Sequence, residues 1–142
     1  MDFLKRFAVD RERAEDGVWV DLGDGLEVCI ARFGSARYKS AMARAFTPHV
    51  GHEDLSDEDA NKITAEAMAD GMLLDWRGLS IGGQEIPYSR DAAFLLLSEY
   101  DEFRERVHRE SRNRDRYAPE DLDAIAQRLG NTLSGSSSTE TE

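Results

Sequence analysis

The chain has 142 residues, of which 40% are apolar and 33% are charged, and its formal net charge at pH 7 is −11. This composition is typical of one globular domain with a strongly solvated surface. The negative charge opposes binding to a phosphate backbone, so we expect no nucleic-acid partner. We also expect no membrane partner, because no apolar run approaches the roughly 20 residues that span a bilayer.

Two further features indicate the compartment. Residues 1–7 lack the apolar core and small-residue cleavage site of a secretory signal. Cys29 is the single cysteine, which excludes an internal disulfide and a zinc site built from several cysteines. We therefore expect a reducing, cytosolic setting.

The N-terminal quarter predicts a β-hairpin at about residues 17–33. The segment before it, residues 2–16, fits a short helix and an edge strand equally well. Two β-rich runs, 18–22 and 26–33, are joined by Gly-Asp-Gly, which is typical of a hairpin turn. The side chains expected to face a core are Leu26, Val28, Ile30 and Phe33.

Apolar periodicity and capping residues predict four helices after the hairpin. Their approximate ranges are 35–46, 56–75, 89–116 and 119–129. Gly78 suits a left-handed cap after the second helix, and the third helix has a candidate break near residues 98–99. Between these two helices, residues 80–87 contain a glycine pair typical of a tight turn or short hairpin.

The predicted fold class is α+β and predominantly α-helical. The N-terminal hairpin packs on a bundle of about four to five helices, because a lone hairpin is only marginally stable in water. We expect a single globular domain at residues 1–130. Residues 131–142 form a polar tail that cannot bury enough surface to order itself.

Residues with catalytic or metal-binding chemistry do not converge in the sequence. His49 and His52 share an acidic loop, but they lack the regular spacing of metal ligands. The acidic run that begins at Asp54 has Asp59 where a calcium loop requires glycine and Ala65 where it requires glutamate. We therefore expect a binding protein rather than an enzyme, with no catalytic residue, no cofactor and no metal.

Basic residues concentrate at positions 104–116, where six arginines stand against three carboxylates, a local balance of +3 that leaves −14 elsewhere. We interpret this segment as a solvated helix face stabilised by ion pairs one turn apart. The pairs expected are Glu102–Arg106, Glu105–Arg109 and Glu110–Arg114. The alternative is an arginine-rich docking face for an acidic partner.

Four sequence segments occur in an ordered series: EDGVWVDLGDG (15–25), ARFGSARY (31–38), LLDWRGL (73–79) and EIPYS (85–89). Together with the helix that begins near Asp91, this series resembles the tail assembly chaperones of long-tailed bacteriophages and prophages. It covers most of residues 7–117, and the arginine-dense segment departs from the family's pattern. The string LLDWRGL is the most identifying feature, and we interpret it as a helix end whose tryptophan anchors the following turn.

The resemblance implies a non-catalytic assembly factor that acts in the host cytoplasm and is absent from the mature virion. Such a protein binds the long tape measure protein and keeps it soluble while tail tube subunits assemble. A frameshift-extended form would recruit the tail tube protein. A groove between helices suits an apolar helix face. The residues we predict for this groove are Met68, Met72, Trp76, Leu96, Tyr100 and Phe103.

Two other functions remain open from the sequence. The charge of −14 outside the arginine segment suits an acidic phage inhibitor that mimics nucleic acid on a host defence protein. The interleaving of acidic with basic residues makes this the weaker interpretation. A head–tail connector or tail-completion subunit of the virion is the other, and it would assemble as a ring.

Overall fold

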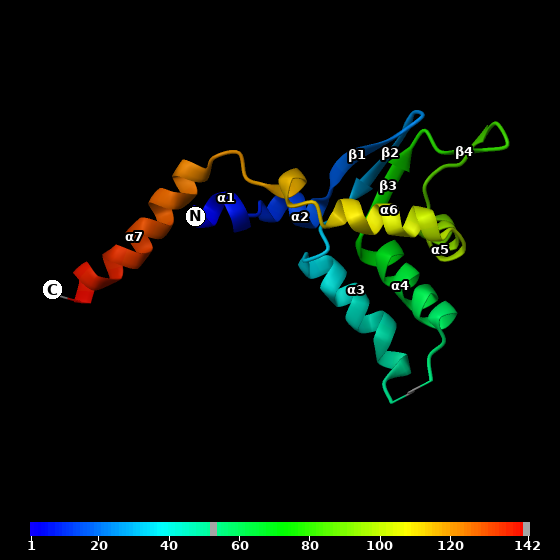
Figure 1. Cartoon of the computed structure of the whole chain (residues 1–142), viewed down its shortest axis with the longest axis horizontal. Helices are drawn as coiled ribbons and strands as arrows, with labels where there is room; N and C mark the ends of the chain where they lie inside the picture. Colours follow the sequence, from blue (N-terminus) through cyan, green and yellow to red (C-terminus); the bar gives the residue numbers. More distant parts are fainter. Residues whose placement is uncertain (52–53, 141–142) are drawn as a thin grey trace.

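The computed structural model describes residues 1–51 and 54–140, and it has the predicted α+β, mainly helical fold, with a small antiparallel sheet packed against helices (Figure 1). The helices are α1 (Phe3–Phe7), α2 (Arg11–Asp16), α3 (Ala36–Phe46), α4 (Asp57–Gly71), α5 (Arg90–Glu99), α6 (Asp101–Ser111) and α7 (Leu122–Glu140), with 3-10 turns η1 (Thr47–His49) and η2 (Arg114–Tyr117). The strands are β1 (Val18–Gly23), β2 (Leu26–Ile30), β3 (Leu73–Arg77), β4 (Ser80–Ile81) and β5 (Gln84–Glu85).

The predicted hairpin is formed by β1 and β2, which pair antiparallel with Gly23 opposite Leu26. Asp24 and Gly25 form the turn, and both have positive φ, as a tight hairpin turn requires. Val28 and Ile30 are fully buried, and Leu26 packs partly buried against the core. These three positions confirm the predicted inward face of the strand.

Phe33 departs from this pattern. It is 43% exposed, so the prediction that it faces the core is wrong. The reason is that β2 ends at Ile30, and the alternation of a strand no longer applies in the bend that follows. Its ring instead contacts the rings of Tyr38 and His108, with centroids 5.5 and 5.1 Å away.

The N-terminal segment, for which a helix and a strand were both open, forms the two short helices α1 and α2. Asp10 caps α2 by accepting from the backbone N–H of Arg13 at 3.0 Å. The Arg13 guanidinium donates to the Ala118 carbonyl oxygen at 3.1 Å, and that of Arg114 donates to the Ala8 carbonyl oxygen at 3.1 Å. These contacts tie the N-terminal helices to the chain that follows α6.

The LLDWRGL string is a strand, so its interpretation as a helix end is wrong. The predicted helix 56–75 ends at Gly71, and β3 then pairs antiparallel with β2, placing Trp76 opposite Val28. Pairing with β2 satisfies the backbone N–H and C=O groups of β3, which helical hydrogen bonds would have satisfied in the predicted helix. Gly78 is not a helix cap: its positive φ of 75° lies in the turn from β3 to β4. The resulting sheet has the order β1-β2-β3.

The remaining helices differ from the prediction mainly at their ends. The predicted helix 89–116 is interrupted at Tyr100, whose extended backbone separates α5 from α6. Helix α6 then ends at Ser111 rather than at residue 116. Helix α7 continues to Glu140, past the predicted end at 129, so the backbone of the polar tail is helical over its described part. The side chains of residues 131–134 are exposed, which leaves this part of α7 without a packed face.

The core lies where the sheet meets the helices α3, α4, α5 and α6. Helices α3 and α4 pack against each other as an antiparallel pair that projects from the sheet (Figure 1). Tyr88 is held against β3, because its hydroxyl donates to the Leu73 carbonyl oxygen at 2.8 Å and its ring meets that of Trp76 edge-on at 4.9 Å. Among the described residues, no helix has the length and apolar character required to cross a membrane.

Candidate functional site: an apolar groove at the α5–α6 junction

The structure divides the six side chains predicted to contact a partner into two groups. Met68 and Met72 are completely buried and Trp76 is 4% exposed, because Met68 of α4, Met72 at the turn from α4 to β3 and Trp76 of β3 all pack into the core. Their assignment to a partner-binding surface is therefore corrected to a packing role. A core face and a binding face show the same apolar periodicity, so the sequence pattern did not separate them.

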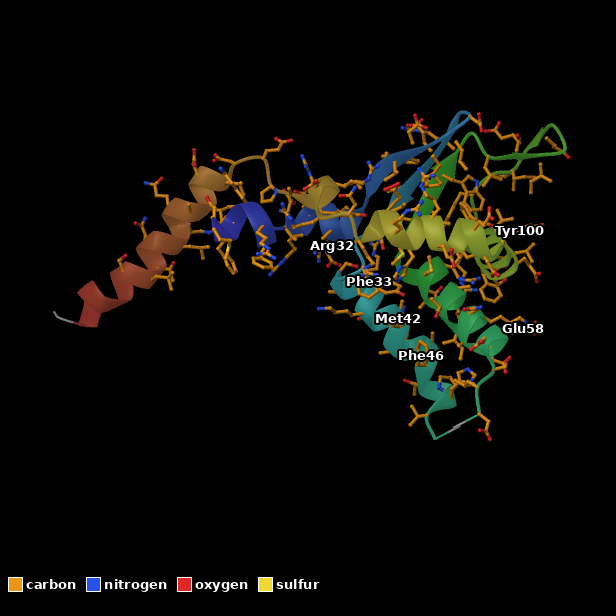
Figure 2. The ribbon with its side chains drawn as sticks, in the orientation of Figure 1. Arg32, Phe33, Met42, Phe46, Glu58 and Tyr100 are labelled. Carbon is orange, nitrogen blue, oxygen red and sulfur yellow. The ribbon has the colours of Figure 1, made fainter. Side chains whose placement is uncertain are left out.

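The other three side chains, Leu96, Tyr100 and Phe103, lie together and line an apolar groove of about 280 Å³. The residues that complete its lining are Leu26, Leu79, Ser80 and Ile81. Tyr100 is 59% exposed and Ile81 is 56% exposed, so apolar surface remains open to solvent at the mouth of the groove. Figure 2 shows Tyr100 at the α5 end of α6.

The break between α5 and α6 positions Tyr100, and Arg104 holds that break in place. The Arg104 guanidinium donates to the Leu97 carbonyl oxygen at the end of α5 (3.0 Å) and to the Asp101 carboxylate at the start of α6 (2.7 Å). Its side chain is 9% exposed and its bond to the Leu97 carbonyl oxygen is buried, whereas the Asp101 carboxylate is 72% exposed. A cation at the C-terminal end of α5 also interacts favourably with the helix dipole. Arg104 thus fixes the angle between α5 and α6, which together form one wall of the groove.

The opposite wall comes from the β4–β5 hairpin, and two hydrogen bonds anchor its base. The backbone N–H of Ile86 donates to the Leu79 carbonyl oxygen, and the Trp76 indole N–H donates to the Ile86 carbonyl oxygen, both at 2.8 Å. The buried Trp76 therefore contributes to the groove indirectly, by fixing the hairpin that carries Ile81.

The groove suits contact with apolar side chains. Apart from Ser80 and Tyr100, its lining is aliphatic and aromatic. Over residues 1–51 and 54–140, no three or more His, Cys, Asp or Glu side chains gather in a way that could hold a metal ion. His52, one of the two histidines of the acidic loop, lies outside the described residues.

Sequence reasoning missed Leu26, Leu79 and Ile81, which come from two parts of the chain that only the sheet brings together. The glycines of the neighbouring turns were the sequence signal that could have indicated this close approach of the two parts. Gly78 has positive φ, and a Cβ atom placed there would lie 2.0 Å from the carbonyl oxygen of Gly25. This close backbone contact brings the β1–β2 turn next to the start of the β4–β5 hairpin.

The arginine segment 104–116 forms a different set of ion pairs from the expected one. Glu110 pairs with Arg106 and Arg116, each at 3.2 Å, rather than with Arg114. Arg114 instead binds the Ala8 carbonyl oxygen of the N-terminal segment. Arg104, Arg114 and Arg116 therefore connect different elements of the fold, whereas Arg106 forms an ion pair one turn away within α6 and Arg109 and Arg112 are exposed.

Comparison with known proteins gives one finding. A family model described as YdaY prophage protein matches residues 33–128, which is more than half of the chain. This range contains α3 to α6 and every lining residue of the groove except Leu26. No curated protein matches the chain, and no solved structure does. The finding supports the predicted phage or prophage origin, whereas the narrower resemblance to tail assembly chaperones stays a prediction.

Proposed function

Because the chain belongs to the YdaY prophage protein family, we propose that it is a non-catalytic tail assembly chaperone that binds the tape measure protein. The observation that carries this proposal is the apolar groove between the α5–α6 junction and the β4–β5 hairpin. It offers Leu96, Tyr100 and Phe103 from helices and Ile81 from the hairpin to the apolar face of a partner helix. Grooves of this kind recognise apolar side chains spaced three or four residues apart on a helix.

The charge of the chain supports the same role. A tape measure protein is expected to be long and helical with an apolar face, so it would aggregate before the tail tube covers it. The groove would shield part of that face, while the net charge of −11 would keep the complex dispersed. In this proposal the protein acts in the host cytoplasm and is absent from the mature virion.

Co-expression tests the proposal. The tape measure protein of the same prophage is produced alone, with this chain, and with the variants Tyr100→Glu and Val50→Glu. Both positions are exposed, so neither change should unfold the chain, but Tyr100 lies in the groove and Val50 lies outside it, between α3 and α4. We expect the wild-type chain and the Val50 variant to raise the soluble fraction and to co-purify with the tape measure protein. The Tyr100 variant should do neither, because a carboxylate in an apolar groove loses its hydration.

If the soluble fraction is the same with and without the wild-type chain, the proposal is wrong. Mass spectrometry of purified phage particles separates it from the role of a head–tail connector or tail-completion subunit. A chaperone should be missing from the particles, whereas a virion subunit would be found there in amounts comparable to other tail proteins.

A further inference from the structure

A second and larger cavity, of about 690 Å³, lies between α4 and α6. Thr64 of α4 lines one side, and His108 and Arg109 of α6, with Arg112 and Asn113 just after it, line the other. Its lining shares no residue with the apolar groove, so a ligand bound there would be independent of the proposed function. The polar, basic character of this lining points to a different kind of ligand.

The six arginines of segment 104–116 divide into two groups by their contacts. Four of them bind groups within the chain: Arg104 binds Asp101, Arg106 and Arg116 bind Glu110, and Arg114 binds backbone carbonyl oxygens of the N-terminal segment. Within the described part of the chain, Arg109 and Arg112 form no ion pair closer than 4.0 Å. Both of these exposed arginines line the cavity. The positive charge that the fold leaves unpaired in this segment is therefore concentrated at one site.

Phe33 contacts two residues that line this cavity, His108 and Arg112. The Arg112 guanidinium lies over the Phe33 ring at 5.7 Å from its centroid, and the His108 ring contacts the same ring edge-on at 5.1 Å. Figure 2 shows Phe33 just before the beginning of α3. These contacts restrict where Arg112 can place its charge.

We infer that this cavity binds the carboxylate side chains of an acidic segment of a protein partner. Arg109 of α6 and Arg112, the residue that caps the end of α6, both line the cavity, and guanidinium groups bind carboxylates with paired hydrogen bonds. Thr64 and Asn113 add polar groups that can bind the backbone of such a segment. A volume of about 690 Å³ exceeds what a single small anion needs and accommodates several side chains.

A nucleic acid fits the same site less well. Binding to a phosphate backbone relies on many basic side chains along the strand, whereas this cavity offers two unpaired arginines and also contains two carboxylates, Glu105 and the Glu110 that Arg106 and Arg116 pair with. The net charge of −11 further opposes a long polyanion. A short segment with two or three carboxylates requires only the local charge pair.

The test uses the full-length chain and a labelled alanine-rich helical peptide of about 15 residues, long enough to form a helix, with glutamates three and four residues apart. A matched peptide carries glutamine at the same positions. Fluorescence anisotropy measures binding, and amide chemical shifts locate it. We expect the glutamate peptide to bind at least about tenfold more tightly than the glutamine peptide, and less tightly as salt rises. The shifted amides should be those of α6 and of Thr64.

Variants connect this binding to the two arginines. The double variant Arg109→Ala and Arg112→Ala should weaken binding by about tenfold or more, whereas Arg44→Ala, an exposed arginine of α3 outside the cavity lining, should leave it unchanged. Equal affinity for the two peptides, or no loss in the double variant, would overturn the inference. Tighter binding of inorganic phosphate or of a single-stranded oligonucleotide at the same amides would overturn it too, by assigning the cavity to another ligand.

Discussion

At the scale of single residues, Tyr117 joins the chain after α6 to the sheet through one buried hydrogen bond. Its side chain is fully buried, and its hydroxyl donates to the Ile30 carbonyl oxygen at 2.9 Å. Burial raises the pKa of Tyr117 above its ordinary value, so the hydroxyl keeps its proton. We expect Tyr117→Phe to lower the free energy of unfolding by about 1 kcal/mol, measured by urea denaturation. Tyr100→Phe, at an exposed position, is the control; an equal effect of the two changes would contradict this role.

His108 makes the stability of the protein depend on pH. Burial, and next the charge of Arg112, lower the pKa of His108 below its ordinary value of about 6.5. As pH falls through about 6.5, the unfolded chain therefore takes up this proton before the folded chain does, and stability is lost. We expect the loss between about pH 7.5 and pH 5.5 to be smaller in His108→Gln than in the wild type. Urea denaturation at the two pH values measures it, and an unchanged loss would show that His108 does not contribute.

At the scale of elements, Gly71 determines how closely α3 and α4 pack. A Cβ atom at this position would lie 2.8 Å from the Arg37 carbonyl oxygen and 2.9 Å from the Cα atom of Tyr38. We expect Gly71→Ala to lower the free energy of unfolding by about 1–3 kcal/mol, because the overpacking cost exceeds the better helix propensity of alanine. Gly130→Ala in α7, where nothing lies within 4 Å of the added atom, should be neutral or stabilising. Thermal unfolding followed by circular dichroism compares them, and similar losses in both variants would contradict this role of Gly71.

Local signals predicted the hairpin, the start of α3 and the break between α5 and α6. Ser35 accepts from the Tyr38 backbone N–H at 3.1 Å, as a capping residue should. Local signals did not predict β3, because a short apolar run such as Leu73-Leu74 fits a helix and a strand equally well. This segment forms a strand because it pairs with β2, which lies more than 40 residues earlier in the chain. A contact so distant in sequence leaves no local pattern.

The sequence predicted the candidate groove only in part. Leu96, Tyr100 and Phe103 share the apolar side of a helical pattern, and the structure keeps them together. Met68, Met72 and Trp76 follow the same kind of pattern but are buried, because neighbouring elements cover them. Only the tertiary fold distinguishes a face that another element covers from a face that stays open.

At the scale of the whole molecule, the groove and the C-terminal helix stand at opposite ends. Figure 1 places the α5–α6 junction and β4 at one end and α7 at the other. In the proposed function, an extension after α7 that recruits the tail tube protein would be held away from the groove. One chain would then contact the tape measure protein and the tube protein without competition between them.

Site-specific photo-cross-linking tests the central claim, that the groove is the binding surface for the tape measure protein, most directly. A photoreactive amino acid replaces Ile81 in the groove or, as the control, Val50, which is also exposed but lies outside it. Each chain is produced with the tape measure protein of the same prophage, irradiated and analysed by mass spectrometry. We expect cross-links from position 81 to an apolar helical segment of the tape measure protein and none from position 50. Equal cross-linking from both positions, or none from position 81 while the two proteins co-purify, would contradict the claim.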